Sequence, residues 1–138
     1  MKKETDWSIK LISFIDEVRR KPFKWGEWDC CAFSDGAIKA MTGEHLIPKS
    51  LKWKNKKTAV EAIRKYGGTI VDAIEKAAKA NKLQPMPTSF ITTGDLVVFK
   101  RDNKNMVGIC DGYYILNPGD EGVECSDNTL AVRVWRIG

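Results

Sequence analysis

Residues 25–33 read WGEWDCCAF, and this stretch places two adjacent cysteines where a helix is expected to begin. Asp29 suits the N-cap of that helix, because its carboxylate can accept hydrogen bonds from backbone amides of the first turn. The helix is predicted from about Asp29 or Cys30 to Met41, before a Thr-Gly stop signal. Unpaired amides and the positive end of the helix dipole favour a thiolate at Cys30. Cys30 is therefore a candidate nucleophile, and the structural alternative is a pair of small buried core residues.

Amphipathic periodicity predicts three more helices in the first part of the chain. From Trp7 to Arg20, apolar residues recur at helical spacing between charged ones, and Asp6 is the expected N-cap. A short helix is expected after Thr58, which can serve as its N-cap, and it ends at the Gly-Gly pair 67–68. The helical pattern repeats from Ile70 to Asn81, and the prolines that follow are expected to break the chain.

After Pro87 the apolar pattern changes to short runs separated by turn residues. Strands are predicted at Leu96–Phe99, Met106–Cys110, Tyr113–Leu116, near Val123, and through Val132, Val134 and Ile137. The Asp-Gly pair 111–112 is typical of a two-residue type I′ hairpin, and residues 117–120 and 127–128 are predicted turns. Helices followed by an antiparallel meander indicate the α+β class, with helices over about 6–81 and the sheet over about 92–137.

Composition limits the kind of protein this is. With 138 residues, 43% hydrophobic and 30% charged, the chain is expected to fold as one domain over residues 1–138. No apolar run approaches the roughly 18–20 residues that span a bilayer, so we expect no membrane insertion, no signal peptide and synthesis in a cytoplasm. The four cysteines lack zinc-ribbon spacing, so reduced thiols are expected, with no metal site and no cofactor.

Four short motifs in this order resemble the NlpC-type cysteine peptidases of the papain-like superfamily. They are the WGEWDC stretch before a helix, the Gly-Asp-Leu-Val run at 94–97, the Val-Gly-Ile run at 107–109, and Gly112. Together with a terminal Val-Trp-Arg, they are more similar still to a small phage and prophage family whose members are typically encoded beside tail genes. The resemblance implies a papain-like, NlpC-type fold in which a helical half packs on an antiparallel sheet.

Carrying the family's site residues onto this chain leaves two roles unfilled. The resemblance places the nucleophile on Cys30 and puts Cys31 where those peptidases usually have serine. It places the general-base histidine on Met106, and a thioether can neither take nor give a proton. The residue that orients the histidine falls on Leu116, while the neighbouring Asn117 is expected on the opposite face of the strand. General acid–base catalysis is commonly worth roughly 10² to 10⁴ in rate, so the sequence predicts a degenerate hydrolase site.

Other residues are candidates to replace the missing base. His45 is the single histidine, but it follows a predicted helix end rather than lying on the strand that faces Cys30. Asp111 could act as a carboxylate base, although Asp-Gly at a hairpin tip is explained by turn geometry. Cys110 and Cys125 could face one another on neighbouring strands, and a reduced pair of core cysteines is the favoured state.

The connection over residues 44–57 holds Trp53 among five lysines. Cations beside a stacking surface are typical of polyanion binders, and the net charge of +5 is compatible with one. A charged loop is more often simply solvated, so the sequence disfavours nucleic acid as the partner. Tryptophans are also enriched among the anchors of protein interfaces. The candidate binding residues are Trp25, Lys52, Trp53 and Lys54.

The favoured functional hypothesis is a phage or prophage virion protein, associated with the tail, that acts as an assembly or binding module. In this hypothesis the chain is a pseudoenzyme whose partners are other virion or tail proteins, with peptidoglycan as a further candidate. Two alternatives stay open. One is an active cysteine peptidase or amidase that cleaves peptidoglycan cross-links with Cys30 as nucleophile. The other is a basic nucleic-acid-binding protein.

Overall fold

The computed structural model describes all residues from Met1 to Gly138, and the helices precede the strands along the chain. The helices are α1 (Trp7–Val18), α2 (Cys30–Thr42), α3 (Lys56–Tyr66) and α4 (Ile70–Ala80). The strands are β1 (Gln84–Met86), β2 (Leu96–Arg101), β3 (Lys104–Cys110), β4 (Tyr114–Gly119), β5 (Gly122–Asp127) and β6 (Ala131–Arg136). Short 3₁₀ turns occupy Thr88–Phe90 and Asn128–Leu130. The predicted α+β class is confirmed.

All six strands join one antiparallel sheet in the order β1-β6-β2-β3-β4-β5. Strands β2 to β5 form the predicted meander, but β6 returns to the other side of β2, and the sheet begins before residue 92. Strand β1 was not predicted, because Pro85 and Pro87 were expected to break the chain. Pro85 pairs with Trp135 at the edge of the sheet, where a missing amide donor is tolerated.

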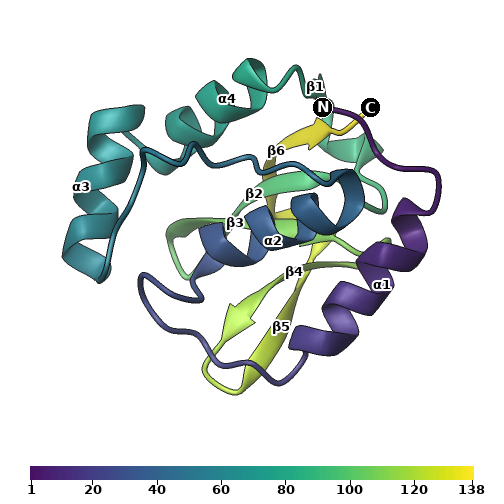
Figure 1. The fold of residues 1–138 in the computed structure, drawn as a ribbon, viewed down its shortest axis with the longest axis horizontal. Coiled ribbons are helices and arrows are strands. Elements are labelled where there is room, and N and C mark those ends of the chain that lie inside the picture. Colours follow the sequence, from purple (N-terminus) through teal and green to yellow (C-terminus); the bar gives the residue numbers. More distant parts are fainter.

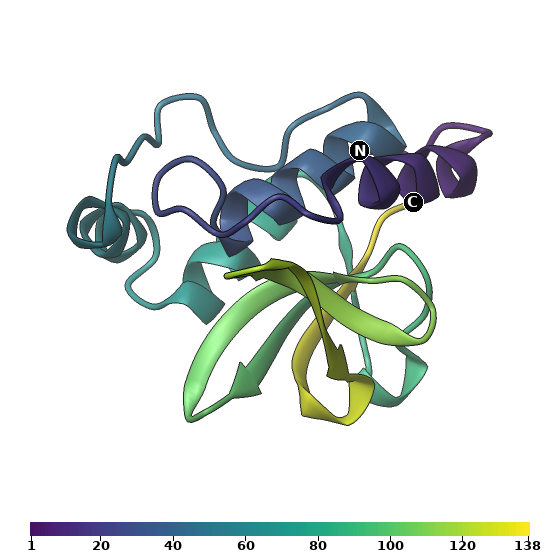
Figure 2. The ribbon, with the colours of Figure 1, turned by 90° about the horizontal axis from the view of Figure 1, so that it is seen from below.

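The helices lie along one side of a curved sheet (Figures 1 and 2). Helix α2 packs across β3 and β4, and its buried residues Phe33 and Ile38 join the main core between the two layers. Helix α3 lies farthest out and packs on α4. Alternate strand residues form a second, smaller apolar cluster on the far face of the sheet. Its buried members are Val97, Phe99, Cys110, Ile115 and Val134.

The tight two-residue hairpin joins β2 to β3, and not β3 to β4 as predicted. Asp102 and Asn103 both have positive φ, 52° and 62°, as a type I′ turn requires. In the β3–β4 connection only Gly112 has positive φ, 105°. There the Asp111 carboxylate accepts hydrogen bonds from the two amides at 113 and 114, which stabilise a three-residue loop instead.

Two helix caps also differ from the predicted ones. The N-cap of α3 is Asn55, whose side chain accepts from the Thr58 amide, so Thr58 is the third helical residue of a capping box. Asp6 holds the N-cap position of α1 without capping it, and its carboxylate lies 3.4 Å from Lys10 Nζ instead. Asp29 caps α2 as predicted, and Gly43 ends that helix in the left-handed conformation.

Strand β4 continues to Gly119 through residues that were predicted as a turn. Pro118 pairs with Val123 on β5, and the alternation of the antiparallel ladder directs its nitrogen toward β3. Proline has no N–H to donate, so Pro118 cannot form a ladder hydrogen bond to β3 from its nitrogen. The β3–β4 ladder contains only the pairs Ile109–Leu116 and Cys110–Ile115. Beyond them the β2–β3 and β4–β5 hairpins diverge (Figure 1).

Candidate active site

Cys30 is the first residue of α2, close to β3 where that strand runs beyond its ladder with β4. The Asp29 Oδ1 atom accepts a hydrogen bond from the Ala32 amide at 2.9 Å, which fixes the first turn of the helix. The Cys110 amide donates to the carbonyl oxygen of Asp95, the residue before β2, so strand alternation directs the Val107 amide away from β2. That amide interacts with the Cys30 sulfur.

These surroundings lower the pKa of the Cys30 thiol below its ordinary value. The strongest cause is the neighbouring Cys31 thiol, which donates a hydrogen bond to the sulfur. Backbone amides of Val107 and Cys31 act in the same direction, as does the positive end of the helix dipole. Burial and the negative charge of Asp29 raise the pKa, but they do not outweigh the donors. Cys30 is therefore the thiol of this protein that is set up to ionise.

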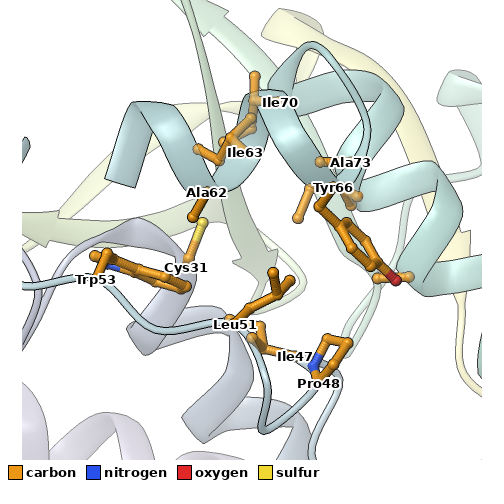
Figure 3. A pocket seen from close by; sticks show the side chains of 12 residues that line it. Cys31, Ile47, Pro48, Leu51, Trp53, Ala62, Ile63, Tyr66, Ile70 and Ala73 are labelled. Atoms are coloured by element: carbon orange, nitrogen blue, oxygen red, sulfur yellow. The ribbon is translucent and has the colours of Figure 1, made fainter. Parts of the chain in front are cut away.

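The Cys31 side chain points into an apolar pocket between α2, α3 and α4 (Figure 3). The pocket has a volume of about 40 Å³, and Trp53, Ile63 and Tyr66 form part of its wall. The hydrogen bond to Cys30 and burial together raise the pKa of Cys31 well above its ordinary value. Cys31 thus stays protonated and serves as a donor to Cys30, in the place where the resemblance expects a serine.

Cys30 lines an open groove with a volume of about 530 Å³. The groove is bounded by the segment before α2, by α3 and by the start of β3. Its apolar lining is formed by Phe23, Trp25, Ala59, Val60, Ile63, Ile70 and Met106. Its cations are Lys56, Arg64 and Lys104. None of these three cations forms a salt bridge within the chain.

Asp29 is the one acidic residue that lines the groove, and its carboxylate accepts three hydrogen bonds from within the chain. It is 2% exposed, so it needs internal donors. Besides the bond to Ala32, its Oδ2 atom accepts from the Gly26 amide at 3.1 Å and from Trp53 Nε1 at 2.6 Å. Asp29 therefore acts as a structural acceptor for three segments of the chain, and the accessible charge in the groove is positive.

Met106, at the expected base position, lines the same groove as Cys30. Its half-buried side chain also packs against the second apolar cluster. Leu116, at the position of the orienting residue, belongs to the main core. Asn117 lies on the opposite face, where its Nδ2 atom donates to Pro118 at 3.2 Å and its Oδ1 atom has no partner. No imidazole lines the groove.

His45 lies in a different depression, which Cys30 does not line. Its Nδ1 atom is 2.7 Å from Asp35, whose other oxygen accepts from the Leu46 and Ile47 amides at 2.7 and 3.1 Å. This arrangement anchors the loop after α2, as expected for a capping or surface histidine. His45 is thus not brought to the Cys30 groove.

The candidate binding residues divide between the two depressions. Trp25 lines the Cys30 groove, whereas Lys52 and Lys54 line the depression that contains His45. Trp53 lines both, so it forms a wall between them. Of the cations in the Cys30 groove, Lys56 belongs to the lysine-rich connection, whereas Arg64 and Lys104 were not predicted, because only tertiary packing brings them close to Cys30.

The two other candidate thiols, Cys110 and Cys125, lie on strands of the sheet. All four cysteines are free, with Cys110 buried and Cys125 exposed. They are not register partners, because Cys110 pairs with Ile115 and Cys125 pairs with Leu116. Burial raises the pKa of both thiols. No group of three or more His, Cys, Asp or Glu side chains is placed to hold a metal ion.

A known protein family matches this chain over nearly its whole length. The model of a family described as a domain of unknown function, DUF6950, matches residues 2–137. No curated protein matches the chain. None of the helices has the length and apolar character needed to cross a bilayer.

Proposed function

The chain belongs to the DUF6950 family over residues 2–137, and we propose that this single domain carries one function. The protein is a binding or assembly module on an NlpC-like, papain-type fold, with a degenerate cysteine-hydrolase site. It acts in a phage or prophage virion, in association with the tail. One observation supports the proposal that the site is degenerate: the groove that Cys30 lines contains Met106 and no imidazole.

The arrangement of the motifs supports the NlpC-like fold. A cysteine begins a helix that packs on an antiparallel sheet, as the papain-like resemblance implies. The Gly-Asp-Leu-Val motif leads into β2, and Val-Gly-Ile lies in β3 beside it. The virion and tail role is supported by the resemblance of the motifs to the phage and prophage family.

The chemistry of amide cleavage supports a non-catalytic role. When a thiolate attacks a peptide carbonyl, the departing amine must receive a proton, and a histidine usually supplies it. The histidine first takes that proton from the thiol, and no side chain of the Cys30 groove is free to do so: Asp29 already accepts three hydrogen bonds, and lysine and arginine side chains are donors without an acceptor. The raised pKa of Cys31 keeps its thiol protonated, so this side chain cannot accept the proton either.

An assay on peptidoglycan fragments tests this proposal. Purified protein is incubated with cross-linked muropeptides, and newly formed amines are quantified. We expect the same background rate for the wild-type protein and for Cys30→Ala. Cleavage that depends on thiol reductant and disappears in Cys30→Ala would contradict the proposal. Fractionation of purified phage particles tests the location, since the protein should co-purify with tails.

A second candidate function is an active cysteine peptidase or amidase that acts on peptidoglycan cross-links. The observation in its favour is the lowered pKa of Cys30 at an open groove. It requires a base that enters the groove only when substrate is bound. The same muropeptide assay separates the two functions, because only the enzyme loses activity when Cys30 is replaced.

A further inference from the structure

We propose that the Cys30 groove binds an acidic, apolar-rich peptide segment of a partner protein in an extended conformation. This inference rests on the binding role proposed above and names the chemistry of the partner. Three features of the groove carry it: unpaired cations, exposed apolar side chains and a strand edge that lacks a partner.

The charge of the groove selects an anionic ligand. Lys56 and Arg64 project from α3, and Lys104 lies at the start of β3, so the cations come from two sides of the groove. All three are exposed and none has an acidic partner within the chain. Carboxylates on a ligand would supply the missing partners and would increase the association rate.

The lining between the cations selects apolar side chains on the same ligand. Trp25 is 38% exposed and Val60 is 44% exposed, and both line the groove. The ring of Phe23 packs edge-on against Trp25, with centroids 5.0 Å apart, which holds the indole in place. A rigid, exposed aromatic side chain beside aliphatic ones is typical of an anchor site for a partner's side chain.

The edge of β3 favours a peptide over other anionic polymers. Asn105 lines the groove and lies two residues before Val107 on β3, so the backbone groups of both residues point to the same side of the strand. Its backbone N–H and C=O therefore point away from β2, on the side where β4 does not pair with this part of β3. An extended peptide can hydrogen-bond to such an edge, as in other cases of strand addition.

The same features argue against a nucleic acid in this groove. One of its two indoles, Trp53, is tied to Asp29 by its Nε1 atom, and Trp25 is packed against Phe23. The aliphatic wall offers no stacking surface for successive bases. Lys52 and Lys54 line the other depression, so they do not extend the basic surface of the groove.

A peptide panel tests the inference by calorimetry at about 50 and about 200 mM salt. The probes are a capped decapeptide that alternates Glu or Asp with Leu or Phe, its Gln and Asn counterpart, and single-stranded oligothymidylate. We expect the acidic peptide to bind at least about tenfold more tightly than its amide counterpart, with weaker binding at the higher salt. Peptide methylated on alternate backbone nitrogens should lose affinity, because it cannot pair with the β3 edge.

Matched variants assign the binding to the groove. The double substitution of Lys56→Ala and Arg64→Ala should reduce the affinity for the acidic peptide to that of the amide peptide. The double substitution of Lys52→Ala and Lys54→Ala should leave it unchanged, since these lysines line the other depression. All four side chains are exposed, so both variants should keep the fold.

Each remaining outcome decides one of the two proposals. Equal affinity for both peptides, tighter binding of the oligonucleotide, no binding of the acidic peptide, or loss of binding in the Lys52 and Lys54 variant would overturn the inference. Cleavage of bound peptide that depends on Cys30 would overturn the proposed non-catalytic function while leaving the ligand assignment intact. Absence of the protein from tails would likewise count against the proposed function alone.

Discussion

Trp53 donates a hydrogen bond from Nε1 to Asp29 Oδ2 at 2.6 Å. This bond joins the lysine-rich connection to the first turn of the helix that carries Cys30. The sequence predicts Trp53 as a binding residue from its lysine neighbours. In the structure it also positions the candidate nucleophile, because it holds the N-cap of α2.

Removing that donor should destabilise the protein. Trp53→Phe keeps an aromatic ring but leaves the buried Asp29 carboxylate with one donor fewer. We expect the free energy of unfolding to fall by about 1–3 kcal/mol, measured by urea denaturation. Trp25→Phe is the control, since Trp25 makes no side-chain hydrogen bond and is 38% exposed, and it should change stability by less than about 1 kcal/mol. Equal losses in both variants would show that the Asp29 bond contributes nothing.

An ion pair between a buried carboxylate and the half-buried Arg136 at the end of β6 gives a second prediction. Asp95 is fully buried, and Arg136 donates to it from Nε at 3.1 Å and from Nη2 at 3.0 Å. Arg136→Met removes both of these donors and the positive charge, and leaves the buried carboxylate with only the Thr92 amide, so we expect a loss of about 3–5 kcal/mol in thermal or urea unfolding. Arg133→Met should be nearly neutral, because Arg133 is exposed and bonds only to the carbonyl before it. A loss in Arg133→Met as large as in Arg136→Met would contradict this account.

The Asp95 pair illustrates what could be predicted from the sequence. The Gly-Asp-Leu-Val motif leads into β2, and the Val-Trp-Arg motif lies in β6, both where the sequence predicts strands. Their link was not predictable, because Asp95 and Arg136 are 41 residues apart and meet only when β6 returns beside β2. Helix periodicity is local, whereas strand order depends on such distant contacts.

Gly26, within the WGEWDC motif, supplies a third prediction. Its φ is +79°, and a Cβ atom there would lie 2.5 Å from the Lys54 carbonyl group. Gly26→Ala should therefore cost about 2 kcal/mol or more, from left-handed strain plus a backbone clash. Gly68→Ala is the matched control, because Gly68 has a φ of +96° with nothing within 4 Å of the added Cβ. Its cost should be limited to strain, and equal costs by urea denaturation would rule out the proposed clash.

The candidate site was predictable at Cys30 and Met106, but the groove was not. Asn-Pro-Gly-Asp at 117–120 has the composition of a turn, yet Pro118 lies inside β4. Its missing N–H ends the β3–β4 ladder, and sequence composition cannot show that a proline's nitrogen faces an open edge. The cations on α3 were hidden for a similar reason, since only the packing of α3 brings them to Cys30.

Cys30 is set up to form a thiolate, and no basic side chain in its groove is placed to exchange protons with it. The rate of its alkylation by iodoacetamide, followed by peptide mass spectrometry across pH, tests this most directly. Because the pKa of Cys30 is lowered, we predict a single ionisation step with a midpoint below that of free cysteine. The profile should be unchanged in His45→Gln, and Cys110 and Cys125, whose pKa values are raised, should react only at higher pH. A second step near neutral pH that Cys31→Ala does not remove, or a shift in His45→Gln, would reveal a base that exchanges protons with Cys30 and contradict this prediction.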